Sequence, residues 1–247
     1  MGEARKEWAS HWRDVGVTVQ DRDVYYYMDT VKLAYARPLL SAGSRCLEVG
    51  SGSGRLSVLL ALEGHQLTCL DYTKEALQAA RRNFAASNVR GRFVQGDALT
   101  LPFATGSFDV VFSTGLLEHF ADPLQIVTEM VRVLRPGGVF FSDIVPRKFS
   151  SLRAFDFMRP GPPVFERRFT RQQIMQMLAK AGLKRAGTFP AGLFPPLWVP
   201  ILIRSKRYRQ MHGRLVGAIL PLLRRLDKTW IAETFGFYWF CWAYKEL

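Results

Sequence analysis

The sequence predicts an α/β protein with a parallel sheet that helices cover on both faces. From residue 44 onward, short apolar segments alternate with stretches whose apolar residues recur every three or four positions. This alternation is typical of consecutive βαβ units. A glycine-rich loop follows the first apolar segment, and acidic residues follow the next two. Because the crossovers of such units are right-handed, the strand ends share one sheet edge, where ligands bind.

Each element is predicted from its own pattern. Residues 3–40 have helical spacing, with Trp8 and Trp12 one turn apart, and give an N-terminal helical cap over residues 1–40. Thr170 and Gly182 begin and end a later helix. We expect helices at 55–63, 74–87, 123–134 and 170–181, and strands at 45–49, 66–70, 92–94, 108–113, 139–144, 183–189 and 235–244. The core domain then consists of residues 41–189 and 231–247, with an insert at 190–230.

Composition and charge narrow the class of protein. The chain has 247 residues, of which 48% are apolar, and this excludes disordered and low-complexity classes. The formal net charge is +13. Residues 1–145 hold 15 Lys and Arg against 16 Asp and Glu, whereas residues 146–247 hold 19 against 5. The basic excess therefore lies in the C-terminal part, where nucleic acid, an anionic membrane or an acidic substrate are the partners to weigh.

The cysteines and the lengths of the apolar segments indicate the cellular compartment in which the protein is expected. Cys46, Cys69 and Cys241 lie in apolar segments without a CxxC pair. We expect reduced, buried thiols in a cytoplasmic protein, with neither a disulfide frame nor a metal site. The first residues lack the apolar core of a signal peptide, and no apolar run reaches the roughly 18 residues of a membrane span. The protein is expected to be soluble or peripheral to a membrane.

The segment CLEVGSGSGRLSVLL predicts a strand, a tight glycine loop and a helix. Glycines allow a sharp turn and let a ligand approach the main chain, where the helix N-terminus offers free N–H groups. Position 55 is Arg, so the loop differs from the G-x-G-x-x-G of dinucleotide sites. Asp71, at the end of the second strand, can accept both ribose hydroxyls of an adenosine. The alternative is a solvated carboxylate at a strand end.

Further candidates follow the third and fourth strands. The Asp97 carboxylate can accept from an exocyclic amine while the Ala98 N–H donates to a ring nitrogen, so this pair is suited to adenine. Ser113 lies at the expected mouth of the pocket. The sequence Arg135-Pro136-Gly137-Gly138 is expected to be a turn that ends a helix and leads into the fifth strand.

Five motifs occur in order along the chain: LEVGSGSG, LD at 70–71, GDALTLPF, FDVVFSTGLLEHF and LRPGGVFF. They resemble the motifs of class I S-adenosylmethionine-dependent methyltransferases and are similar to those of the small-molecule group that includes the ubiquinone and menaquinone biosynthesis enzymes. The resemblance covers residues 44–145 and, more loosely, the segment RRFTRQQIMQMLAKAGL. It is specific for the cofactor and not for the substrate.

The resemblance implies a Rossmann-like, doubly wound, seven-stranded sheet with an antiparallel last strand, an N-terminal helical lid and a helical insert before the last strand. It also implies S-adenosyl-L-methionine as the cofactor. The glycine loop would pass under the methionine part, Asp71 would hold the ribose and Glu48 would orient the loop. Tyr72 would stack near the adenine or be a surface aromatic. The implied cofactor-binding residues are Glu48, Gly50, Ser51, Gly52, Gly54, Asp71, Tyr72, Asp97, Ala98 and Ser113.

Methyl transfer from a sulfonium is an in-line displacement in which alignment and exclusion of water do most of the work. An acceptor hydroxyl or acidic carbon also needs a base nearby. His119 is the one histidine that the sequence places near the cofactor edge, although its Glu-His pair resembles a feature of enzymes with many specificities. Tyr25 and Tyr26 could reach over the cofactor as a lid on the substrate side, or pack in the core.

The residues after the fourth strand argue against nucleic-acid methylation. Enzymes that methylate base amines tend to have an Asn/Asp-Pro-Pro-aromatic run there, and this chain has Ser113-Thr114-Gly115-Leu116. No cysteine lies in a loop at the pocket edge, where methylation of pyrimidine C5 would need a nucleophile. We therefore expect no nucleic-acid partner.

The insert combines apolar and basic residues. Its apolar stripe consists of Tyr208, Met211, Leu215, Ile219, Leu222, Leu226 and Trp230, and basic residues fall on the opposite side. Gly213, Gly217 and Pro221 predict two helices or one kinked helix. Three interpretations stay open. The stripe could cover the core, or it could contact anionic lipid together with LFPPLWVPILI and Trp198, or the insert could form a lid over the substrate pocket.

The sequence as a whole predicts an enzyme of the EC 2.1.1 type, a methyltransferase that uses S-adenosyl-L-methionine. Its acceptor is expected to be small and apolar or lipid-like, methylated at O, C or N. Two alternatives stay open. One is an RNA methyltransferase that uses the basic C-terminal region, and the other is a non-catalytic cofactor-binding protein.

Overall fold

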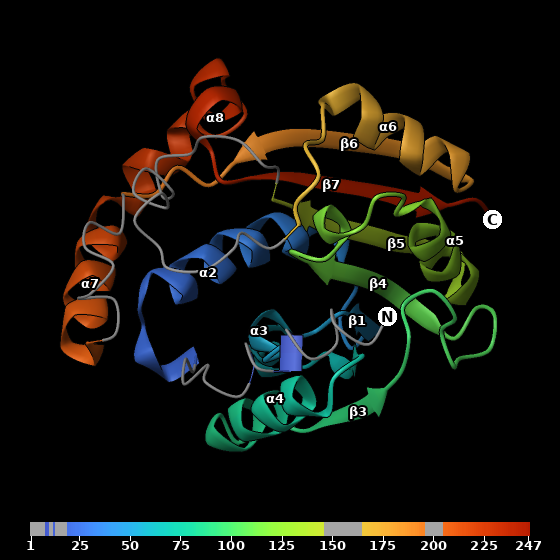
Figure 1. The fold of residues 1–247 in the computed structure, drawn as a ribbon, viewed down its shortest axis with the longest axis horizontal. Coiled ribbons are helices and arrows are strands. Elements are labelled where there is room, and N and C mark those ends of the chain that lie inside the picture. Colours follow the sequence, from blue (N-terminus) through green and yellow to red (C-terminus); the bar gives the residue numbers. More distant parts are fainter. Residues whose placement is uncertain (1–7, 10–11, 13–18, 146–164, 196–204) are drawn as a thin grey trace.

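The structure is a computed structural model that describes residues 8–9, 12, 19–145, 165–195 and 205–247. Its centre is a seven-stranded sheet with the order β3-β2-β1-β4-β5-β7-β6 (Figure 1). The strands are β1 (Arg45–Val49), β2 (Gln66–Asp71), β3 (Gly91–Gln95), β4 (Phe108–Thr114), β5 (Leu134–Ile144), β6 (Leu183–Ala191) and β7 (Tyr238–Lys245). The first five are parallel, and β7 runs antiparallel to both β5 and β6. The predicted doubly wound sheet with an antiparallel last strand is confirmed.

The helices also follow the predicted order. The α-helices are α2 (Val24–Ala36), α3 (Arg55–Leu62), α4 (Lys74–Ala86), α5 (Leu124–Val133), α6 (Arg171–Lys180), α7 (Lys206–Leu223) and α8 (Trp230–Phe235). Short 3-10 helices are η1 (Val19–Asp21), η2 (Arg37–Leu39), η3 (Leu117–His119) and η6 (Arg224–Leu226). Thr170 caps α6 with a reciprocal pair of hydrogen bonds to Gln173, which is why the helix begins where the sequence predicts. The side chain of Asp23 accepts from two N–H groups in the first turn of α2.

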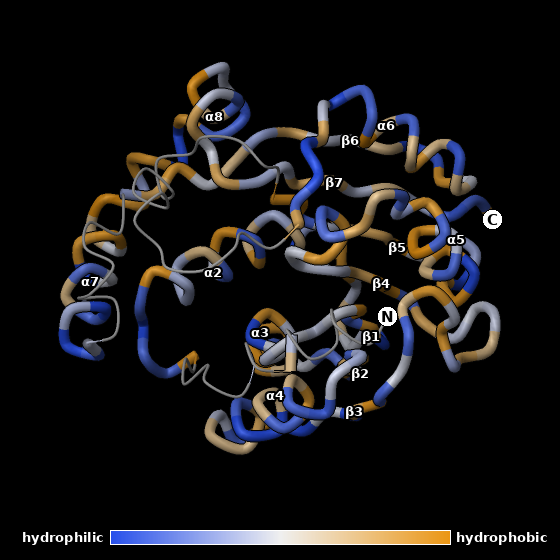
Figure 2. Tube along the Cα trace, in the orientation of Figure 1, coloured by the Kyte–Doolittle hydropathy of each residue, from blue (hydrophilic) through white to orange (hydrophobic). Residues whose placement is uncertain are grey.

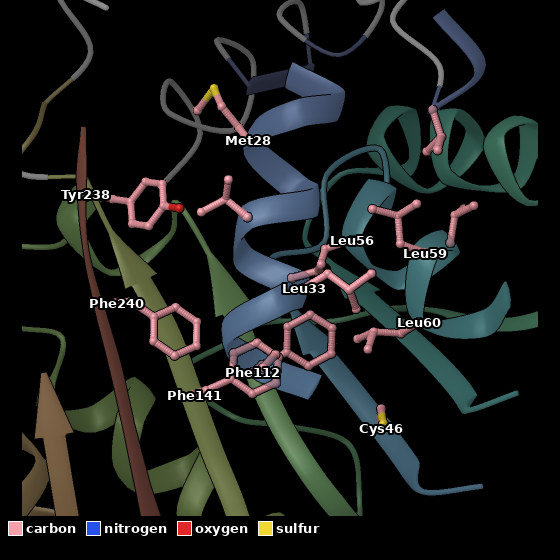
Figure 3. Packing of buried hydrophobic residues seen from close by; sticks show 14 of the residues in the cluster. Met28, Leu33, Cys46, Leu56, Leu59, Leu60, Phe112, Phe141, Tyr238 and Phe240 are labelled. Carbon is pink, nitrogen blue, oxygen red and sulfur yellow. The ribbon is translucent and has the colours of Figure 1, made fainter. Parts of the chain in front are cut away.

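The two faces of the sheet carry separate hydrophobic cores because neighbouring residues of a strand point to opposite sides. On one face Phe112, Phe141 and Phe240, from β4, β5 and β7, pack under α2 (Figure 3). The Phe112 and Phe141 rings stack with their centroids 4.7 Å apart. On the other face the cluster includes Phe140 of β5 and residues of α5 and α6. Helices thus cover both faces, as predicted.

The three cysteines are free and buried, as expected from their apolar surroundings. Burial raises the pKa of Cys46 to about 12, so this thiol stays protonated. Among the described residues, no helix is both long and apolar enough to cross a membrane.

In the described part of the insert, helix α7 lies against α2. Helix α7 runs through Gly213, Gly217 and Pro221 without a break, and η6 continues it. Added side chains at the two glycines would collide with the Arg22 and Asp23 backbone and with the Tyr27 ring. The glycines therefore allow α7 to approach α2 closely. Of the two predicted alternatives, two helices or one kinked helix, residues 206–223 do not form two separate helices.

The apolar stripe of the insert does not cover the core, contrary to one of the three interpretations given above. The buried residues of α7 are His212, Gly213 and Val216. Four members of the stripe are instead largely exposed: Met211 (62%), Leu215 (53%), Leu222 (63%) and Trp230 (72%). Arg207 and Arg214 are exposed as well, so the outer face mixes apolar and basic residues, which alternate along α7 in Figure 2. Trp198 lies outside the described residues.

Two other boundaries differ from the prediction. The last strand begins at Tyr238 and not at residue 235, because residues 230–235 form α8 and Gly236 follows it. The fifth strand begins at Leu134, so the expected turn at 135–138 is an irregular start of β5. Gly137 there has a φ of +69°, a conformation that favours glycine.

Candidate active site

The glycine loop connects β1 to α3 at the carboxyl edge of the sheet. Gly50 and Gly52 have φ angles of +66° and +51°, which L side chains rarely adopt. A Cβ at Gly50 would lie 2.6 Å from the Leu116 Cδ1 atom, so the absence of a side chain also lets the loop after β4 close over it. Gly54, at φ +65°, precedes the first residue of α3 and packs against α4. The residue types of this loop are therefore fixed by backbone geometry.

Asp71 links this loop to the end of β2. Its Oδ2 atom accepts the Gly52 N–H at 2.9 Å, and its Oδ1 atom accepts from the Thr73 N–H and hydroxyl at 2.9 and 3.0 Å. Burial raises its pKa, and these hydrogen bonds oppose the shift. A carboxylate can accept about four hydrogen bonds, so capacity remains for a ligand hydroxyl. The arrangement fits the ribose role that the resemblance implies.

The adenine candidates lie after β3. The Asp97 Oδ1 atom accepts the Leu99 N–H at 2.9 Å, which holds the turn, while Ala98 follows it in the wall of the same cavity. Tyr72 is half-buried next to Asp71 and lines that cavity as well. The predicted adenosine residues are thus brought together at one place.

Glu48 is buried behind the loop and does not line the cavity. Its carboxylate accepts from the Ser57 hydroxyl at 2.5 Å and from the Thr114 hydroxyl at 3.0 Å. Burial raises its pKa to about 7, against the lowering effect of both hydroxyls. Glu48 therefore ties α3, which follows the glycine loop, to the end of β4. This is consistent with an indirect role in orienting the loop.

One cavity of about 600 Å³ contains most of the predicted residues. Among the cofactor candidates, Gly50, Ser51, Gly52, Asp71, Tyr72, Asp97 and Ala98 line it. Three do not line it: Glu48, Gly54 and Ser113. The Ser113 hydroxyl instead pairs with that of Ser142 at 2.9 Å inside the sheet, and Thr114 takes its place at the wall. Pockets of this size accommodate cofactors and drug-sized ligands.

The substrate-side candidates divide in two. Tyr25 lines the cavity, and the guanidinium of Arg55 lies 5.1 Å from its ring centroid. Tyr26 lies outside the lining and packs edge-on against Tyr27 at 5.3 Å. The lid interpretation therefore fits Tyr25, and the packing interpretation fits Tyr26.

His119 lines the cavity from η3. Its Nδ1 atom lies 2.8 Å from the Phe165 carbonyl oxygen, and its ring meets Trp8 edge-on at 4.9 Å. Because a carbonyl only accepts, Nδ1 carries a proton, and Nε2 of the neutral ring is the proton acceptor. Glu118 beside it is buried, with its Oε1 atom accepting the Val145 N–H at 3.1 Å. Burial raises the pKa of Glu118 to about 8.

Several cavity residues were not predicted from the sequence. They include Asp29 and Lys32 on α2, Arg55 at the start of α3 and Asp143 near the end of β5. Arg55 pairs with Asp29 at 2.7 Å, and Lys32 pairs with Asp143 at 3.0 Å. A charged residue within an otherwise apolar strand or helix face is the sequence feature from which these cavity residues could have been predicted. In the described residues no group of His, Cys, Asp and Glu is arranged to hold a metal ion.

Comparisons with known proteins agree with this geometry. Residues 47–142 match the model of a methyltransferase domain. The ubiquinone biosynthesis O-methyltransferase of Xanthomonas oryzae pv. oryzae is 37% identical over 122 residues, which cover 49% of this chain and 51% of that protein. The demethylmenaquinone methyltransferase of Clavibacter sepedonicus is 37% identical over 97 residues, 39% of each chain. This chain spans about half the length, or less, of these two relatives.

The fold is also that of solved methyltransferases. A SAM-dependent methyltransferase from Thermotoga maritima superposes with a TM-score of 0.60 at 18% identity, over 90% of this chain and 92% of the other. Residues 47–142 are therefore a methyltransferase domain, and the resemblance drawn from the five motifs is confirmed.

Proposed function

We propose that the chain is a methyltransferase that uses S-adenosyl-L-methionine and acts on a small, apolar or lipid-like acceptor. The observation that carries the proposal is the single cavity in which the glycine loop, Asp71 and Asp97 face Tyr25 and His119. The cavity has the groups suited to adenosine, and in this proposal the acceptor occupies the remainder. Such a site would act by aligning the methyl group and by excluding water.

The strand order supports placing the cofactor and the acceptor at different ends of the cavity. The glycine loop, Asp71 and Asp97 follow β1, β2 and β3, so the cofactor would lie over this half of the edge. The acceptor would lie over the ends of β4 and β5. Aromatic residues line the cavity, namely Trp8, Trp12, Tyr25, Phe120 and Phe237. Of these, Trp8 packs against His119 after β4, whereas Trp12 lies against Gly52 of the glycine loop. His119, whose Nε2 can accept a proton, is the candidate base.

The named relatives act in ubiquinone biosynthesis or on demethylmenaquinone. We extend this to a quinone-like acceptor for this chain, since an apolar, aromatic-lined cavity suits a ring with few charges. Tritium-labelled S-adenosylmethionine, incubated with the protein and cell extract, tests the class of acceptor. Label in the lipid fraction is expected. Label in RNA would favour the RNA alternative, and cofactor binding without any labelled product would favour the non-catalytic one.

The cofactor site has its own test. Asp71→Asn removes the charge from a carboxylate proposed to hold a ribose hydroxyl, and hydrogen bonds to charged groups are worth about 1.5–3 kcal/mol. We expect the affinity for S-adenosylhomocysteine, measured by calorimetry, to fall about 10- to 100-fold. Asp122→Asn, at an exposed position outside the cavity, is the matched control and should bind normally. Equal affinity of Asp71→Asn and wild type would refute the assigned ribose site.

We also propose that the outer face of α7 and α8 contacts an anionic membrane surface. This outer face has exposed apolar residues, Met211, Leu215, Leu222 and Trp230, beside exposed arginines at 207, 214 and 225. Apolar side chains flanked by basic ones suit the boundary of an anionic bilayer. Co-sedimentation with vesicles that contain phosphatidylglycerol tests it. Binding should be lost in a Met211→Glu, Leu215→Glu variant and be weak on neutral phosphatidylcholine vesicles; equal binding to both vesicle types would contradict the role of the arginines.

A further inference from the structure

Two buried charged residues lie in the wall of the cavity at its acceptor end. Lys32 comes from the middle of α2, and Asp143 from the carboxyl end of β5. Their side chains are 9% and 1% exposed, and the Lys32 Nζ atom lies 3.0 Å from the Asp143 Oδ2 atom. A buried ion pair is not by itself stabilising, because desolvation costs about as much as the attraction returns. Its presence in a cavity wall calls for a role beyond packing.

The Asp143 carboxylate has unused capacity to accept hydrogen bonds. The Lys32 ammonium, 3.0 Å from the Oδ2 atom, donates to the carboxylate, and among the described residues no other side chain donates a hydrogen bond to either oxygen. The nearest hydroxyl across the β4 pairing, that of Thr114, donates to Glu48 instead. A carboxylate can accept about four hydrogen bonds, so one ammonium leaves part of this capacity unused. Asp143 belongs to the lining of the cavity, and its carboxylate thus keeps capacity for a further donor there.

The surrounding charges keep this carboxylate in place. Lys32 also lies 3.9 Å from Asp29, which Arg55 holds through bonds of 2.7 and 2.8 Å. Two anions and two cations therefore alternate along the wall. The Tyr238 ring lies 5.5 Å from the Lys32 Nζ atom and fills the space on that side. Burial raises the pKa of Asp143, and Lys32 acts in the opposite direction.

We propose that Asp143, positioned by Lys32, binds a hydroxyl group of the acceptor and so selects acceptors that carry one. The inference rests on the proposed function and adds the chemistry by which the acceptor is recognised. Asp143 lies on β5, on the far side of β4 from the strands whose ends carry the cofactor candidates. It is therefore placed to contact the acceptor and not the adenosine. A hydroxyl donor would form a charge-assisted hydrogen bond, which is stronger than a neutral one.

The test compares two probes that differ only in hydroxyl groups, 4-nitrocatechol and 1,2-dimethoxy-4-nitrobenzene. Binding is followed by quenching of tryptophan fluorescence with S-adenosylhomocysteine present. Wild type should bind 4-nitrocatechol at least ten times more tightly than the capped probe. In Asp143→Asn this preference should fall to less than threefold. Asp122→Asn, the same change at an exposed position outside the cavity, should keep the wild-type preference.

A second variant separates recognition from folding. Asp143→Asn leaves buried Lys32 with only the more distant Asp29, whereas Lys32→Met combined with Asp143→Asn removes both charges of the Lys32–Asp143 pair together. The double variant should fold, as judged by circular dichroism, and should also lack the preference. A double variant that keeps the preference would overturn the proposal, as would wild type that binds the two probes equally or binds neither.

Calorimetry with S-adenosylhomocysteine distinguishes the possible failures. The affinity of Asp143→Asn for this ligand should stay within threefold of wild type. A loss of tenfold or more would assign the pair to the methionine end of the cofactor and overturn the proposal while leaving the proposed function intact. If wild type does not bind S-adenosylhomocysteine at all, the proposed function itself fails.

Discussion

Tyr35 of α2 donates its hydroxyl to the Asp227 Oδ2 atom at 2.5 Å. The other oxygen of Asp227 accepts the Gly192 N–H at 3.0 Å. Gly192 follows β6, where the insert begins, and Asp227 follows η6, near its end. One buried carboxylate therefore joins both ends of the insert to the helix that walls the cavity. Burial and Asp227 both raise the pKa of Tyr35, so the hydroxyl keeps its proton.

Tyr35→Phe removes this donor and leaves a buried carboxylate oxygen poorly satisfied. Leaving a buried acceptor without its partner costs about 1–3 kcal/mol, and we expect the free energy of unfolding to fall by that amount. Urea denaturation measures it. Tyr208→Phe, at a half-buried position on α7, is the matched control and should change stability by less than about 0.5 kcal/mol. Equal losses in the two variants would contradict the importance of the Tyr35 contact.

Gly217→Leu tests the close packing of α7 on α2. Leucine favours a helix over glycine by roughly 0.8 kcal/mol, so helix propensity alone would stabilise the variant. A side chain at this position would collide with the Tyr27 ring, and such overpacking costs about 1–3 kcal/mol. We therefore expect a net loss of stability and faster proteolysis within α7. Ala218→Leu, one residue later on the exposed face, should show neither effect.

Glu118→Gln tests the buried acid behind His119. Burial raises the pKa of Glu118 to about 8, so the folded state holds a proton that the unfolded state releases above its ordinary pKa of 4.5. Protonated Glu118 therefore contributes fully to the free energy of unfolding below pH 4.5, and this contribution is lost as the pH rises toward 8. The loss is about 1.4 kcal/mol for each pH unit inside this window. Glutamine does not titrate, so the variant should gain stability relative to wild type between pH 5 and pH 9 in urea denaturation; a difference independent of pH would contradict the raised pKa.

Asp109 should show the opposite pH dependence. Its carboxylate accepts from Arg45 and Arg135, and hydrogen bonds from Arg45 are the main reason that its pKa falls to about 2. The stabilisation is present above the ordinary pKa of 3.8 and is lost as the pH falls through about 2. Asp109→Asn should cost roughly 1 kcal/mol at pH 6, since the group is only partly buried, and much less at pH 2. Thermal unfolding at the two pH values measures this, and an unchanged difference at pH 2 would disprove the linkage.

The sequence was sufficient to predict those features that depend on residues close to one another along the chain. The glycine loop, Asp71 and the Thr170 cap each follow from local backbone demands, and the structure places them as expected. The Lys32–Asp143 pair could not be predicted, because it forms only when α2 packs across β5. The helical spacing likewise predicted that α7 is amphipathic, but it did not predict which side of α7 packs against the rest of the protein. The two glycines at 213 and 217 decided that, by allowing close contact on a face that has few large apolar residues.

The position of β7 has a consequence for how the protein is made. This strand lies between β5 and β6, although β6 and the whole insert precede it in the chain. While the ribosome is still translating α7 and α8, β5 has an open edge and β6 has no strand to pair with. The first five strands can assemble during translation, but the far side of the sheet must wait for residues 238–245. Chaperone binding to stalled nascent chains should therefore persist until this segment emerges.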